Sequence, residues 1–64
     1  MTKKIKAWVV WSPTRGVAGV FEVEQQAIGV ALFENASSKI PKTDPSRFIV
    51  KPCTVTFSVQ EPHP

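Results

Sequence analysis

The shortness of the chain, together with its single cysteine, is the strongest constraint on what it can fold into. A domain of 64 residues buries only roughly 60% of the surface that its unfolded chain exposes, so its core is thin. Small domains offset a thin core with disulfides, bound metals or association. Cys53 has no second cysteine to pair with, and the single histidine, His63, lies outside any cluster with metal-ligand spacing. Association with a partner protein or with a second copy of the chain is the support that remains.

The residue types that carry catalysis are present but not grouped. Four residues are possible nucleophiles: Ser12, Ser37, Ser38 and Cys53. The only imidazole, that of His63, follows the last expected strand. None of the three glycines is followed by the Gly-Lys-Ser/Thr sequence of a phosphate-binding loop. We therefore expect a protein that is not an enzyme, with no catalytic residue, no metal and no cofactor.

Charge and hydropathy set further expectations. The net charge of +3, with a pI near 9.4, permits an anionic partner without requiring one. The apolar run Ile5–Trp11 is short and interrupted by Lys6, whereas a membrane span needs roughly 20 apolar residues and a signal peptide needs a small-residue cleavage site. The lack of a cysteine pair fits a reducing compartment. We expect a single cytoplasmic domain over residues 1–64, with no membrane segment and with flexible ends at 1–4 and 61–64.

Two segments near the N-terminus predict a β-hairpin. Ile5–Trp11 and Val17–Val23 are rich in β-branched and aromatic residues, and Pro13 and Gly16 between them are typical of a turn. Gly19 inside the second segment indicates a bulge or strong curvature.

Arg47–Gln60 is the clearest strand region, and it follows a loop over residues 36–46. Its apolar residues alternate, so that one face carries Cys53, Val55, Phe57 and Val59. We take this face as the inner one and expect Cys53 to be buried. Because Pro52 lacks an N–H group, we expect it to separate residues 48–50 as a short edge segment or bulge.

Glu24–Asn35 is consistent with two structures. With a period of two, Ile28, Val30 and Leu32 share a face; with helical spacing, Ala27 and Ala31 do. Gly29 and Val30 in the middle, and the absence of an N-capping residue, favour the strand. We expect residues 28–32 to be extended and paired with the second strand.

Short twisted strands with a glycine-bearing hairpin predict an all-β fold, a small five-stranded and partly open barrel. The stretches that carry this pattern are Trp8–Phe21 and Cys53–Val59, and their spacing resembles that of the cold-shock domain family, whose barrel is of the oligonucleotide-binding type. The alternative is an α+β unit, with a three-stranded sheet and one helix at 24–36.

The resemblance implies a small nucleic-acid-binding accessory protein, and single-stranded RNA or DNA as its partner. Such domains stack bases on surface aromatic residues, but Val17, Gly29 and Ala31 stand where the family has aromatic residues or histidine. Weak binding is therefore expected. The candidate binding residues that remain are Lys6, Trp8, Arg15 and Phe33.

The second functional hypothesis is a protein-interaction or regulatory module that has lost the nucleic-acid surface. Trp8 and Val10, with Gly29 and Ala31 nearby, would give a flat apolar surface for a homodimer or for a larger partner protein. Interface cores favour tryptophan and disfavour charge, which suits this residue set.

Overall fold

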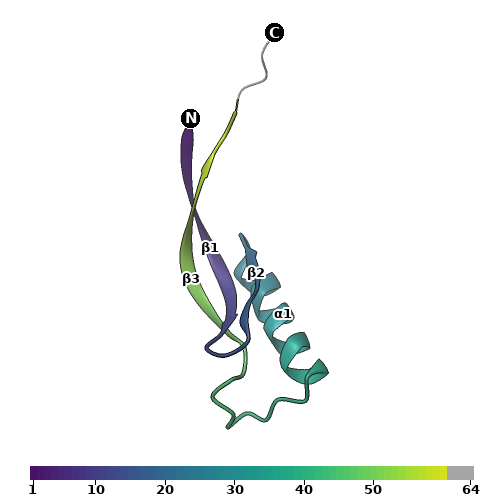
Figure 1. The fold of residues 1–64 in the computed structure, drawn as a ribbon. Helices are drawn as coiled ribbons and strands as arrows, with labels where there is room; N and C mark the ends of the chain where they lie inside the picture. Colours follow the sequence, from purple (N-terminus) through teal and green to yellow (C-terminus); the bar gives the residue numbers. More distant parts are fainter. Residues whose placement is uncertain (61–64) are drawn as a thin grey trace.

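The computed structural model describes residues 1–60, which form three strands and one helix (Figure 1). In chain order these are β1 (Thr2–Ser12), β2 (Gly16–Phe21), α1 (Glu24–Ser37) and β3 (Ile49–Ser58). The strands form one antiparallel sheet in the order β2-β1-β3. Residues 2–4, expected as a flexible end, form the start of β1; the flexible end expected at 61–64 lies outside the described residues.

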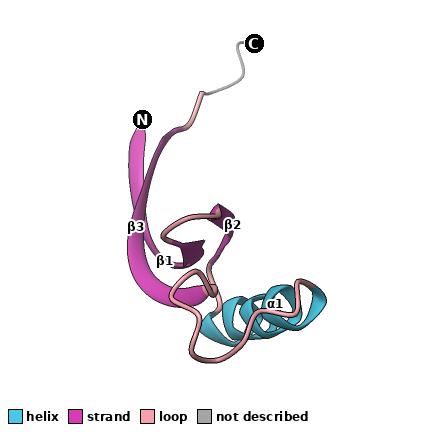
Figure 2. Ribbon diagram, turned by 60° about the horizontal axis from the view of Figure 1, so that its bottom comes forward, coloured by secondary structure: helices cyan, strands magenta, loops and turns pink. Residues whose placement is uncertain are grey.

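The five-stranded barrel predicted from the sequence is wrong, and the α+β alternative is the fold. The described residues form an open three-stranded sheet with one helix on one of its faces (Figure 2). The barrel required residues 28–32 as a strand, and they lie instead in the middle of α1. The prediction for those residues is wrong for the same reason.

The helix forms because of its inward face and despite its local sequence. Ala27, Ala31 and Asn35, spaced four apart, are its buried residues. A glycine within a helix costs about 1 kcal/mol relative to alanine, and Val23 at the N-cap makes no side-chain capping bond. Gly29 faces open space, so it interrupts no contact of the helix with the sheet. Burial of the small-residue face outweighs these local penalties.

The predicted hairpin is confirmed, and so is its bulge. β1 and β2 pair antiparallel from Trp8–Phe21 to Ser12–Gly16, with a register shift between Val10 and Trp11 that leaves Ala18 as the extra residue of β2. Gly16 has a φ of 85°, a conformation that glycine adopts without strain. The strands therefore meet through a short turn and twist more strongly at the bulge.

β3 is continuous across Pro52, so the predicted separation of residues 48–50 is wrong. All ten residues from Ile49 to Ser58 belong to the strand, and Pro52 pairs with Trp8. The sheet order explains this tolerance, because β3 is an edge strand and proline is accepted where no neighbouring strand needs its N–H group.

The hydrophobic core is small and lies between α1 and one face of the sheet. Its buried members are Val10, Ala27, Ala31 and Phe48. Partly buried side chains surround this cluster: Trp8, Phe21, Val30, Ile40 and Val50. We call the face of the sheet under α1 the inner face.

Two polar side chains fasten the long connection between α1 and β3 to this core. The side chain of Asn35 donates to the carbonyl oxygen of Phe48 (3.0 Å) and accepts from its backbone N–H (2.7 Å). The hydroxyl of Ser12, which is fully buried, donates to the carbonyl oxygen of Ser46 (2.6 Å) and accepts from the backbone N–H of Arg15 (3.1 Å). Each thus ties the loop to a different element.

Asp44 organises the same loop. Its Oδ1 accepts from the backbone N–H of Ser46 (2.8 Å) and from the Ser46 hydroxyl (2.7 Å). These two hydrogen bonds, the backbone one first, hold the pKa of the Asp44 carboxyl below its ordinary value. The turn around Ser46 is thereby set for its contact with Ser12.

The ends of β1 and β3 extend beyond the helix as a two-stranded ribbon. Residues 2–7 pair only with β3, since the pairs with β2 begin at Trp8. Figures 1 and 2 show this ribbon curving away from α1. Its tip is closed by Met1, whose carbonyl oxygen accepts from the N–H of Val59 (2.8 Å).

The contact between Asn35 and Phe48 predicts a large effect for a single truncation. Asn35→Ala leaves a buried backbone N–H and a buried carbonyl without partners, which costs about 1–3 kcal/mol for each group left unsatisfied. We expect a loss of about 2–4 kcal/mol in the free energy of unfolding, measured by urea denaturation. Gln25→Ala, on the exposed side of α1, is the control and should change little. A loss for Asn35→Ala no greater than for the control would contradict this role.

Candidate interaction surface

The face of the sheet opposite α1 is mostly apolar, and no helix among the described residues packs on it. In β1 this outer face carries the odd-numbered residues, because Val10 and Trp8 point to the inner core. The strand pairings place the matching residues of the other two strands beside them. The outer face comprises Met1, Lys3, Ile5, Ala7, Val9, Trp11, Val17, Val20, Ile49, Lys51, Cys53, Val55, Phe57 and Val59.

Exposure distinguishes the two faces near the ends of the sheet, although Ala7 at the middle of the outer face is only 2% exposed. Val10 on the inner face is 0% exposed, whereas Trp11, the next residue, is 39% exposed on the outer face. Val17 and Phe57, at opposite ends of the outer face, are exposed to 61% and 40%. A contiguous apolar surface of this kind is uncommon on a monomer and marks an interaction site.

The charges on the strands are all of one sign. β1 and β3 contain four lysines (Lys3, Lys4, Lys6 and Lys51) and no acidic residue. Lys3 and Lys51 belong to the outer face, and Lys4 and Lys6 to the other side of the ribbon. The outer face is therefore apolar with two positive charges.

The accessible surface and the radius of gyration of the molecule are both larger than those of a compact domain of this size. Its accessible surface is 5061 Å², whereas about 4,100 Å² is typical for a compact monomer of its mass. Its radius of gyration is 14.8 Å, against about 11 Å for a compact domain of this length. The excess is what an uncovered sheet face and a protruding ribbon produce.

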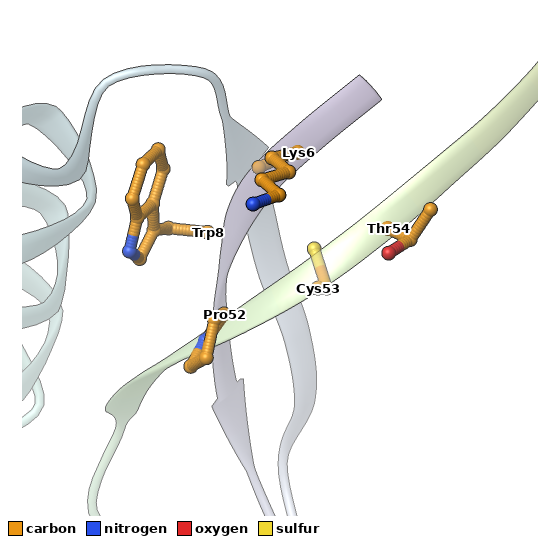
Figure 3. A pocket seen from close by; sticks show the side chains of 6 residues that line it. Lys6, Trp8, Pro52, Cys53 and Thr54 are labelled. Atoms are coloured by element: carbon orange, nitrogen blue, oxygen red, sulfur yellow. The ribbon is translucent and has the colours of Figure 1, made fainter. Parts of the chain in front are cut away.

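Two of the four residues predicted from the sequence as a nucleic-acid site do lie together. Lys6 and Trp8 occupy neighbouring positions on the inner side of the ribbon, just beyond the cover of α1. With Ala7, Pro52, Cys53 and Thr54 they line a shallow pocket of about 280 Å³ (Figure 3). Trp8 is partly buried and packs against the core, so it offers only part of its ring to a ligand.

The other two predicted residues lie elsewhere. Arg15 is in the β1–β2 turn, beyond Ser12, where β1 ends. Phe33 is on α1 and 67% exposed, on the side of the helix away from the sheet. Neither lines the pocket of Lys6 and Trp8.

The predicted protein-contact surface of Trp8, Val10, Gly29 and Ala31 is also displaced. Val10 and Ala31 are buried against each other in the core, so this side of the sheet already has its cover. Sequence reasoning thus found the apolar alternation but assigned the interface to the wrong face. The signal that identifies the outer face is that β1 is apolar on both sides from Ala7 to Trp11, while residues 1–60 contain only one helix to cover it.

Cys53 is partly exposed, so its predicted burial is wrong. It pairs with Ala7 and shares the outer face with Val55 and Phe57, as the alternation indicated, but that face is the uncovered one. No group of three or more metal-ligating side chains exists among residues 1–60. Within the same part of the chain, no helix is long and apolar enough to span a membrane.

No protein-family model, curated protein or solved structure matches the chain. The functional argument therefore rests on the surfaces described above. The resemblance to cold-shock domains finds no support in these comparisons, and α1 occupies the residues where that resemblance needs a strand.

The exposure of Cys53 predicts its reactivity. In dilute native protein a thiol reagent should label Cys53 to completion without denaturant, because access does not require unfolding. The matched control is Cys53→Ser combined with Ala31→Cys, which moves the thiol into the core. Labelling of Cys53 as slow as labelling of the core thiol would show that the outer face is covered.

Proposed function

We propose that this protein is a non-enzymatic protein-interaction module whose binding surface is the outer face of its sheet. The observation that carries the proposal is the contrast between the two faces: α1 closes the inner one, and the outer one exposes large apolar side chains toward both of its ends, Trp11 and Val17 at one and Phe57 at the other. Water is a poor solvent for such a surface, and its burial against a partner contributes roughly 25 cal/mol per Å².

The composition of the outer face suits this role. Interface cores are depleted in charge and enriched in aromatic residues. Trp11 and Phe57 supply the aromatic residues, and the two charges are lysines, whose aliphatic stems can lie along an apolar surface while the ammonium groups reach water. The three strands give this surface a hydrogen-bonded, preformed backbone, so little ordering accompanies binding.

Site-specific photo-crosslinking in cells tests the proposal. A photo-reactive residue in place of Val20, which is exposed on the outer face, should give discrete protein adducts. The same residue in place of Phe33, which is at least as exposed but lies on α1, should give none. Equal adducts from both positions, or none from Val20, would contradict the assignment of the outer face.

The pocket of Lys6 and Trp8 supports a second candidate function, weak binding of a single-stranded nucleic acid. Lys4 lies on the same side of the ribbon as Lys6, and Thr54 and Thr56 are their partners on β3. Cations, hydroxyls and part of an indole ring are the groups that contact phosphates and bases. One partly available ring in place of a row of aromatic residues implies weak affinity.

Oligonucleotide titration at low salt tests this second function. In a Trp11→Phe background the fluorescence of Trp8 should change on binding, and log K should fall with log[salt] with a slope of about −1.4 if two cations contact phosphates. Lys6→Gln should reduce the slope by about 0.7, whereas Lys51→Gln, on the outer face, should not. Trp8→Ala is a poor probe because Trp8 also packs against the core. No spectral change at high protein concentration would exclude this use of the pocket.

A further inference from the structure

We propose that the partner on the outer face is a second copy of this chain, packed sheet against sheet about a two-fold axis that passes near Ala7 and Cys53. This inference rests on the proposed function and names its partner. It places one helix on each outside surface of the dimer and the two sheets between them. Each copy then supplies the second apolar layer that the other lacks.

The area involved is what a stable dimer requires. The accessible surface of the chain exceeds that of a compact monomer of equal mass by about 1,000 Å². A standard protein–protein interface takes about 800 Å² from each partner. An interface of that size on the outer face would therefore remove from each copy an area comparable to the excess.

Charge disfavours one other mode of self-association, which is pairing between two copies of the open edge of β1. The edge of β1 is open over residues 2–7. If this edge paired antiparallel with the same edge of a second copy, Lys3, Lys4 and Lys6 of one copy would lie opposite or diagonal to the same lysines of the other. Like charges directly opposite each other destabilise a strand pair, and lysines on an open edge prevent such pairing. The open edge of β1 is therefore not where two copies associate.

The positions of the outer-face lysines locate the axis. We number each level of the outer face by its β1 residue, and the β3 residue paired with it has the same level. Lys3 is then at level 3, and Lys51, which pairs with Val9, is at level 9. Consider a two-fold axis that lies between the sheets and crosses the strands at level 7, where Ala7 pairs with Cys53. It places level 3 of one copy over level 11 of the other, and level 9 over level 5. Each lysine then lies over apolar residues, Lys51 over Ile5 and Val55, and no two lysines meet.

The same axis brings the smallest side chains of the face to its centre. Ala7 is 2% exposed and Cys53 partly exposed, so little side-chain bulk separates the two sheets there, while the more exposed Trp11 and Phe57 lie toward the ends. Lys51 is on the edge strand β3, so its ammonium group can reach water at the rim of the interface. No charge is buried by this arrangement, which avoids the cost of desolvating an unpaired ion.

Sedimentation equilibrium of the purified wild type, over concentrations from low to high micromolar, tests the existence of the dimer. We expect a reversible monomer–dimer equilibrium. Trp11→Glu should raise the dissociation constant at least tenfold, because it introduces a charge into the interface. Phe33→Glu makes the same change on α1, where the side chain is exposed, and should leave the constant unchanged. Circular dichroism of both variants confirms that they remain folded.

Thiol crosslinking tests the position of the axis. A short bis-maleimide should join two copies through Cys53 when the protein is largely dimeric. The matched control is Cys53→Ser combined with Thr54→Cys, which moves the thiol by one residue to the opposite face and should give no crosslinked dimer. Equal crosslinking from both positions, or none from Cys53 in a dimeric sample, would contradict the proposed axis.

The outcomes separate this inference from the proposed function on which it rests. A chain that is monomeric at every concentration, but that still gives adducts of other proteins from Val20 in cells, overturns the homodimer and leaves the interaction module standing. A dimer that Trp11→Glu does not weaken overturns the sheet-to-sheet arrangement. A monomer that gives no adducts from Val20 overturns both.

Discussion

The contact between the small-residue face of α1 and the inner face of the sheet is the interaction on which the rest of the structure depends. Ala27 and Ala31 carry short side chains that let the helix backbone approach Val10, which is fully buried beneath them. One helix of 14 residues has only one such face and covers only one side of a sheet. The existence of an uncovered side follows from this limit.

The polar contacts around this core decide where the chain goes next. Asn35 continues the inward line of the helix with a group that satisfies both backbone groups of Phe48. Phe48 is thereby held in the core immediately before β3 begins, and Ser12 holds the preceding turn through Ser46. The entry of β3 into the sheet beside β1 is fixed at this end, and the ribbon grows outward from it.

Local pattern was enough to predict the hairpin, its bulge and the alternation of the last strand, though not the continuity of that strand across Pro52. Alternation of side chains identified the two faces of β1 and the shared face of Cys53, Val55 and Phe57. Helix α1 could not be predicted in the same way. Gly29, Val30 and the missing N-cap argue against a helix locally, and only the contact of Ala27 and Ala31 with a sheet formed by other segments reverses the balance.

Only part of the candidate site could be predicted, because alternation assigns residues to one side of a strand but does not show where a helix packs. Lys6 and Trp8 are two residues apart on one strand, so alternation alone places them on one side. Arg15 and Phe33 were added from a resemblance to a barrel that the chain does not form, and α1 takes Phe33 to the far side of the helix. Which face of the sheet stays open depends on where α1 packs, and no local pattern encodes that. The interface was therefore assigned to the closed face.

The central claim is that the inner face is closed within one chain while the outer face closes only by association. The most direct measurement is quenching of Trp11 fluorescence by acrylamide in a Trp8→Phe variant, followed as a function of protein concentration. The account predicts that Trp11 is readily quenched in dilute protein and becomes shielded as the concentration rises, with a midpoint at the dissociation constant of the dimer. Shielding of Trp11 that is complete at the lowest concentration and does not change would contradict the account, because the chain would then cover its own outer face.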